Sequence, residues 1–217
     1  MKLADSWVAV WATMATLAAY ELALLALQSR SPNRLARTAH AMLRQDWFEA
    51  LSQQAGTEIL AVQTLRNSLM SATMLASTAA LGLMGTVTLA VPALHAGFET
   101  ASIGPPVVTP RLLLELSLLT LLFSALVCTL MSVRFFNHAG YISSMSVGSR
   151  QRERWNAAGA SHLRKAGLLY SWGLRQLVLV VPVVAATLLP AAGPVAAVLV
   201  VGVLFSFDKI PAAEDVA

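Results

Sequence analysis

The apolar residues of this chain gather in four long runs from which charged residues are almost absent. The runs are Trp7–Leu27, Ser68–Leu94, Leu112–Phe136 and Leu168–Phe207. A helix needs about 20 residues to cross the roughly 30 Å of hydrocarbon in a bilayer, and each run is long enough. One buried core helix could explain one such run, but not four in a chain of 217 residues. The pattern therefore predicts an all-α, polytopic transmembrane helical bundle.

The fourth run is about 40 residues long, which is too long for a single crossing. Its middle, Pro190–Pro194, reads PAAGP, and proline disfavours a continuous helix because it removes a backbone donor and clashes with the preceding turn. Two interpretations stay open. A helical hairpin over 169–189 and 194–209 gives five spans, and a single broken helix gives four. We favour the hairpin, which puts the C-terminus and Lys209 in the cytoplasm, although its second arm is short for a full crossing.

Positive charge is distributed unevenly between the two sides of these runs. Five arginines lie between the first and second runs, and seven lysines and arginines lie between the end of the third run and the start of the fourth. The opposite side carries only Lys2 and Arg111. Lysine and arginine gather in cytoplasmic loops, so we predict an external N-terminus and cytoplasmic segments over 28–66 and 137–167. The Gly- and Pro-rich segment His95–Pro110 is typical of an external loop.

Composition narrows the class of protein further. Charged residues make up 12% of the chain and the mean hydropathy is +0.66, whereas soluble domains carry roughly 25% charged residues. The basic balance, with a pI of about 9.7, is explained by topology, so we expect no nucleic-acid partner. The lone Cys128 excludes an intrachain disulfide and is expected to be a small buried residue. We expect one transmembrane domain over 1–217, with 7–27 a retained first span rather than a signal peptide.

The segment 33–54 shows helical periodicity outside the apolar runs. Its apolar residues recur at spacings of three and four, and most of its charged residues lie elsewhere on the helix. Ser31 and Pro32 would supply a cap and a first-turn proline. We predict an amphipathic helix at the cytoplasmic head-group level, acting either as a connector or in recognition of anionic lipid or a partner. The segment 150–165 is also predicted to be helical and to continue into the fourth run.

A candidate intramembrane polar cluster is the sharpest functional feature of the sequence. Glu21 lies about two turns before the cytoplasmic end of the first run, and a carboxylate in hydrocarbon normally faces the bundle interior or water, with a partner. Arg66, Arg134 and Arg175 lie at the same end of the other three runs. The four side chains could therefore form a polar vestibule or ion site, or else a structural ion pair near the interface.

Two further features of the runs are expected to be structural. Glu115 follows Arg111 by four residues at the outer end of the third run, where an acid suits the helix dipole. The second run is rich in small residues spaced to let helices approach closely, at the bundle centre or in an oligomer interface. The candidate helix-packing positions are Ser68, Ala72, Ala76, Gly82 and Gly85. A pore lined by serine and threonine hydroxyls is the functional alternative.

Motifs of enzymes and cofactor sites are not found in the sequence. The four histidines lack the spacing of a metal site, and the chain has no HExxH, Walker loop, GxSxG or paired-carboxylate helix motif. We therefore expect no catalytic residues, no metal, no cofactor and no enzymatic activity.

Three stretches carry a resemblance to a known family. They are EILAVQTLRNSLMSATMLASTAALGLMG (Glu58–Gly85), SVRFFNHAGYISS (Ser132–Ser144) and WGLRQLVLVVP (Trp172–Pro182), followed by the late Gly-Pro break. Together they resemble the domain-of-unknown-function 599 family (DUF599) of bacterial and plant integral membrane proteins, over nearly the whole chain. The last hairpin departs from the family, which tends to have aromatic residues where this chain has Ala and Val. The resemblance implies a multi-pass protein of a bacterial inner membrane and brings no site residue.

These observations leave two functional hypotheses. The leading one is a homo-oligomeric channel or transporter-like protein for a small solute or ion, since helix breaks often line solute sites and an oligomer would help to form a pathway. The alternative is a non-catalytic accessory or scaffold subunit that packs against a larger membrane complex. In that case the small-residue helix and the amphipathic helix would be docking surfaces.

Overall fold

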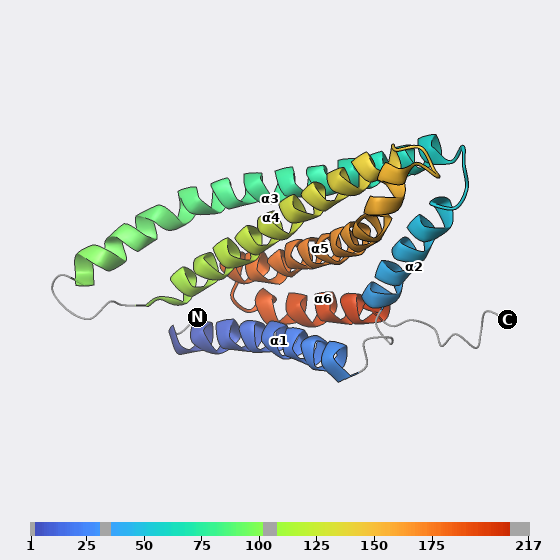
Figure 1. Ribbon diagram of the computed structural model, residues 1–217. Helices are drawn as coiled ribbons and strands as arrows, with labels where there is room; N and C mark the ends of the chain where they lie inside the picture. The colour runs from blue at the N-terminus through green and yellow to red at the C-terminus, as the bar shows by residue number, and fades with distance from the viewer. Residues whose placement is uncertain (1–2, 31–35, 102–107, 209–217) are drawn as a thin grey trace. The chain divides into compact units, whose positions relative to one another are not determined.

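The computed structural model describes residues 3–30, 36–101 and 108–208, and these residues form α-helices without strands (Figure 1). The all-α prediction is therefore confirmed. Helix bounds are as follows: α1 Leu3–Arg30, α2 Ala36–Leu51, α3 Glu58–Ala101, α4 Pro110–Ser143, α5 Arg150–Leu188 and α6 Ala192–Asp208.

Four of these helices contain stretches long and apolar enough to cross a membrane: Ser6–Arg30, Glu58–Pro92, Pro110–Ser143 and Arg150–Leu188. Many of their large apolar side chains are exposed, as expected for side chains that contact lipid tails. The shorter α6 is also apolar, with 17 residues.

The helices extend beyond the apolar runs at which the sequence predicts the spans. With 44 residues in α3 and 39 in α5, a rise of 1.5 Å per residue gives lengths of about 66 Å and 58 Å, well over the roughly 30 Å of hydrocarbon. The predicted continuity of 150–165 with the fourth run is confirmed, since both lie in α5. The predicted loop His95–Pro110 is wrong over 95–101, which belong to α3, and Gly104–Pro106 lie outside the described residues.

Local sequence signals set several helix starts. Thr109 accepts a hydrogen bond from the backbone N–H of Leu112 and precedes Pro110, which suits a first helical position because its missing N–H needs no partner there. Ser149 caps α5 in the same way through the N–H of Arg152. Gly148, just before that cap, has a φ of +80°, a conformation that residues with a Cβ rarely adopt.

The last apolar run forms two helices joined by a tight turn, as the sequence favours. The N–H groups of Ala192 and Gly193 donate to the carbonyls of Leu189 and Pro190 across this turn. A Cβ on Gly193 would lie 2.6 Å from Cβ of Ala186 and 2.5 Å from Oγ1 of Thr13, so only glycine lets α6 fold back on α5 and α1 here. Whether α6 completes a fifth crossing stays a prediction, and Lys209 lies outside the described residues.

The chain divides into two compact units, each built from portions of several helices. The first unit comprises residues 1–30, 78–125 and 175–207. Its core is formed by α1, α4, α5 and α6, with Val10, Leu114, Val183 and Ala197 at or below 2% exposure. These four helices therefore share one apolar interior.

The described residues of the second unit are 36–77, 126–174 and 208. Its core joins α2, α3, α4 and α5 through buried residues that include Phe48, Leu65, Phe136 and Leu163. The hydroxyl of Ser132 in α4 donates to the carbonyl of Ala166 in α5 at 2.8 Å, which links two buried helix surfaces. The single-domain prediction for 1–217 stays a prediction.

The helix predicted over 33–54 is confirmed over 36–51 as α2, which lies in the second unit. Its buried residues are Ala36, Arg37, Ala41 and Phe48, whereas the apolar Leu43 is exposed, as a side chain that contacts lipid would be. Its position at the cytoplasmic head-group level stays a prediction. The predicted cap at Ser31 and Pro32 lies outside the described residues.

Candidate functional site

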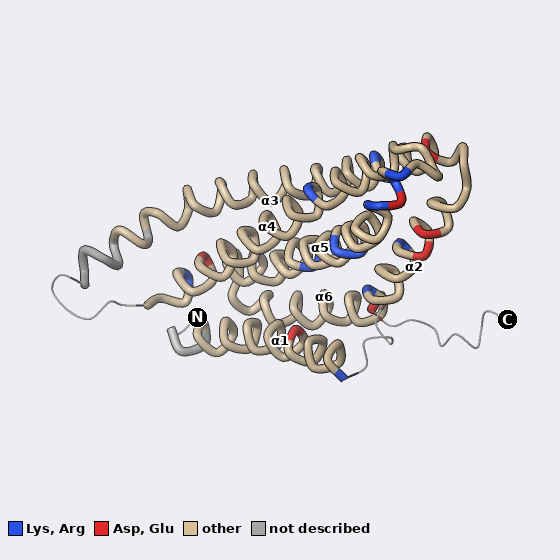
Figure 2. The backbone as a smooth tube through the Cα atoms, in the orientation of Figure 1, with Lys and Arg blue, Asp and Glu red and all other residues tan. Residues whose placement is uncertain are grey.

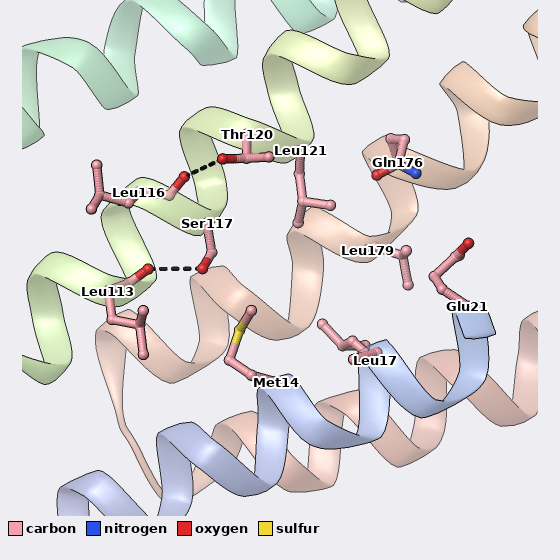
Figure 3. A pocket seen from close by; sticks show the side chains of 11 residues that line it. Met14, Leu17, Glu21, Leu113, Leu116, Ser117, Thr120, Leu121, Gln176 and Leu179 are labelled. Carbon is pink, nitrogen blue, oxygen red and sulfur yellow. Dashed lines mark hydrogen bonds between the residues drawn. The ribbon is translucent and has the colours of Figure 1, made fainter.

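A cavity of about 320 Å³, open to the surface of the first unit, lies between α1, α4 and α5 (Figure 3). Small-molecule sites are typically clefts of about 300–1,000 Å³ with apolar walls and a few placed polar groups. The wall is mostly leucine and methionine. Its polar members are Glu21 of α1, Ser117 and Thr120 of α4, and Gln176 of α5.

Glu21 lies within the apolar run of α1 and is 21% exposed at its side chain. Its Oε1 atom lies 3.8 Å from Nη1 of Arg175, whose side chain is 7% exposed. The Arg175 guanidinium also lies 5.3 Å from the ring centroid of Tyr20, a cation–π arrangement. The Glu21–Arg175 pair thus holds a carboxylate at the cavity wall beside a buried cation.

Each hydroxyl group on the α4 wall donates a hydrogen bond within its own helix. Ser117 donates to the Leu113 carbonyl at 2.8 Å, and Thr120 donates to the Leu116 carbonyl at 2.9 Å (Figure 3). A hydroxyl that donates to the preceding turn keeps its lone pairs as acceptors. The cavity therefore presents acceptors on two walls, namely these hydroxyl oxygens and the Glu21 carboxylate, and the Gln176 amide adds both an acceptor and a donor.

The other two arginines of the predicted cluster belong to the second unit. Arg66 and Arg134 are both exposed, on α3 and α4 respectively. Of the four predicted residues, the structure brings together Glu21 and Arg175. The reason is helical phase: residues at equal depth in different helices need not face the same interior.

The ion pair at the start of α4 is formed as its spacing predicts. Nε of Arg111 lies 2.8 Å from Oε1 of Glu115, and the Arg111 side chain is 73% exposed whereas that of Glu115 is 5% exposed. Glu115 does not line the cavity. It is therefore a second intramembrane carboxylate in the same unit, with a different environment.

The candidate packing residues of α3 differ in their surroundings. Ala72 and Ala76 are buried in the second unit, and Ser68 is half-buried there. In the first unit, a Cβ on Gly82 would contact Leu122 of α4 at 3.0 Å, whereas one on Gly85 would meet no described atom within 4 Å. The small residues thus permit close helix contacts at some positions and lie on an exposed surface at others.

The sequence analysis did not predict the roles of three arginines of the second unit. The charged residues of this unit lie along α2 and at the adjoining ends of α3, α4 and α5 (Figure 2). Arg37 is 7% exposed, with its guanidinium 4.5 Å from the Trp172 ring centroid. Arg44 lies on the same face, and burial lowers the pKa of its guanidinium, an effect that Tyr170 opposes. The third, Arg152, is 1% exposed. The recurrence of 37, 41, 44 and 48 at helical spacing was the available signal for the first two.

Side chains that could bind a metal ion are not grouped together in the described part of the chain. No group of three or more His, Cys, Asp or Glu side chains is placed there to hold a metal ion. Cys128, which the sequence analysis expects to be buried, is half-buried.

Fold and site together define a protein that is all-helical in its described residues, with four helices long and apolar enough to cross a membrane and a mostly apolar cavity between three of them. The sequence matches, over residues 8–212, the family described as "Protein of unknown function, DUF599". The chain belongs to this family, as its motifs indicated. No curated protein and no solved structure matches it.

Proposed function

We propose that this protein is a small membrane transporter whose solute site is the cavity between α1, α4 and α5. The observation that carries the proposal is Glu21, a carboxylate on the wall of a mostly apolar cavity between helices long and apolar enough to cross a membrane. An ionisable side chain at such a position is costly and is typically kept for a solute or ion pathway.

The chemistry of the wall favours a particular class of solute. Its acceptors, the Glu21 carboxylate and the Ser117 and Thr120 oxygens, suit a solute that donates hydrogen bonds or carries a positive charge. The leucine and methionine side chains suit an apolar body. A small organic ammonium ion satisfies both requirements, with its charge at Glu21.

We propose the orientation that the positive charges favour, with the N-terminus outside and the basic segments in the cytoplasm of a bacterial cell. In that orientation the Glu21 end of the cavity is nearer the cytoplasm. Binding and movement of a solute, rather than catalysis, is the activity that the acceptor-lined cavity supports.

An accessory subunit is the second candidate, and the outer surface of α3 favours it. Leu81 and Met84 are 70% and 68% exposed, and the neighbouring Gly85 is also exposed, which would let another helix approach. A second copy of the chain on this surface would give the homo-oligomer expected from the sequence. A stoichiometric partner of different mass, co-purified in mild detergent, would favour the accessory role.

Uptake of a labelled organic cation tests the transporter. In proteoliposomes at pH 6, we expect saturable uptake of 2-phenylethylammonium and none of the similarly sized anion benzenesulfonate. The Glu21→Gln variant should lower the initial rate at low solute by about tenfold or more, because a hydrogen bond to a charged group contributes about 1.5–3 kcal/mol.

The matched control is Glu115→Gln, which removes the other carboxylate of the same unit outside the cavity. Once its folding is verified by circular dichroism, this variant should transport at the unmodified rate. Equal losses in the two variants, faster uptake of the anion, or no uptake above protein-free vesicles would contradict the proposal.

A further inference from the structure

Two cavities in the second unit share part of their walls. The smaller, of about 140 Å³, is lined by Arg44, Ser68, Ser71, Phe136 and Tyr170. The larger, of about 310 Å³, shares Arg44, Ser68 and Phe136 with it, and the rest of its wall is mostly apolar. The Arg44 side chain therefore lines both a small cavity with several polar residues and a larger, mostly apolar one.

The Arg44 side chain is positioned by glycine and carries unused donors. A Cβ on Gly167 of α5 would overlap Nη1 of Arg44 and lie 3.0 Å from its Cζ, so the guanidinium rests where only glycine leaves space. Among the described residues it makes one long hydrogen bond, 3.5 Å to the His40 carbonyl, and no ion pair. A guanidinium has five N–H donors, so most of them are available to a ligand.

The surrounding hydroxyls can join this arginine. Ser68 and Ser71 donate to their own helix at 3.3 and 3.1 Å, longer than the usual hydroxyl hydrogen bond, and each hydroxyl can rotate toward a stronger acceptor. The acids of α2, Asp46 and Glu49, are exposed and line neither cavity. The local charge is thus positive.

The position of these cavities along the helices indicates their depth in the bilayer. Ser68 begins the second apolar run, Phe136 ends the third, and Tyr170 lies two residues after the start of the fourth. All three therefore lie where hydrocarbon gives way to the head-group region, the level of the lipid phosphates.

We propose that this site binds one anionic phospholipid, with its phosphate at Arg44 and part of an acyl chain in the cavity beside Trp47. Arginine matches phosphate geometrically through paired N–H donors. The mostly apolar second cavity favours a lipid over a free phosphate, because a free phosphate has no apolar group that could occupy this cavity.

Quenching of Trp47 tests the proposal. In a variant that keeps Trp47 and has phenylalanine at the other four tryptophans, we compare nanodiscs containing phosphatidylglycerol or phosphatidylcholine with brominated acyl chains. We expect the apparent affinity for phosphatidylglycerol, measured by the quenching of Trp47, to be roughly fivefold higher than that for phosphatidylcholine. This is the effect of about one basic residue at the membrane surface. The Arg44→Gln variant should bring this ratio to about one.

The matched control is Arg66→Gln, which removes an exposed charge two residues before Ser68. It should leave most of the preference in place. Gly167→Ala keeps the charge of Arg44 but displaces its guanidinium, so it should also reduce the preference for phosphatidylglycerol. This variant replaces Arg44→Gln in the test if Arg44→Gln does not fold. Equal quenching by the two lipids, equal losses in Arg44→Gln and Arg66→Gln, or relief of quenching by millimolar inorganic phosphate would each overturn the proposal.

Discussion

Replacing Arg152 with methionine is expected to lower the free energy of unfolding by about 3–5 kcal/mol, because several buried acceptors would each lose a charged donor at a cost of about 1–3 kcal/mol. The Arg152 side chain is 1% exposed. Its Nη1 donates to the carbonyls of Ile142, Ser143 and Met145 at 2.7–3.0 Å, where α4 ends and its carbonyls lack helical partners.

The same guanidinium also contacts its own helix and α2. Nε donates to Asn156 at 2.9 Å, Nη2 donates to Ser52 after α2 at 3.3 Å, and the group lies 5.5 Å from the Phe48 ring centroid. Methionine keeps much of the apolar stem but offers no donor, so several buried acceptors would lose their partner.

Thermal and denaturant unfolding followed by circular dichroism in mild detergent provide the measurement. Arg150→Met is the matched control, because Arg150 lies two residues away in the same helix and is exposed. It should change stability by no more than about 0.5 kcal/mol. A similar loss in both variants would show that Arg152 contributes only its surface charge.

The Gly159→Ala substitution is expected to destabilise the protein by about 2–3 kcal/mol through overpacking. A Cβ there would overlap the end of the Phe48 ring, lie 2.8 Å from Cε1 of that ring, and approach Cγ2 of Ile142 to 3.2 Å. Phe48 is 1% exposed and packed in the core of the second unit, so the ring cannot move aside freely.

Gly140→Ala is the control for this substitution. Gly140 also lies in a helix of the second unit, and a Cβ there would meet no described atom within 4 Å. Alanine should be neutral or stabilising at this position, because it favours a helix by up to about 1 kcal/mol over glycine. Equal unfolding midpoints for the two variants would show that α5 does not pack on Phe48 as described.

Hydropathy and charge were sufficient to predict the helical class, because a span must satisfy its backbone internally and keep charges out of lipid. The helix break at Pro190 could also be predicted from the sequence. The helix ends could not be predicted, since polar and apolar stretches continue as one helix in α3 and α5.

The candidate site was only partly predictable, because depth along a helix does not determine the direction of a side chain. Glu21 was identified from its cost in a membrane, and Arg175 lies beside it, yet Arg66 and Arg134 are exposed in the other unit. Gln176 and the α4 hydroxyls carry no signal in the sequence. They become informative when the wall of the cavity is known.

The most direct test of the cation-selective cavity is the reaction of a single cysteine placed in its wall. In a Cys128→Ala background, the Ser117→Cys thiol is exposed to matched cationic and anionic methanethiosulfonate reagents in reconstituted vesicles. Phe123→Cys, on the exposed surface of α4 outside the cavity, is the control. We expect faster reaction of Ser117→Cys with the cationic reagent, a preference that Glu21→Gln removes, and little reaction of Phe123→Cys. Equal rates with the two reagents at Ser117→Cys, or no reaction there, would contradict the cation-selective cavity.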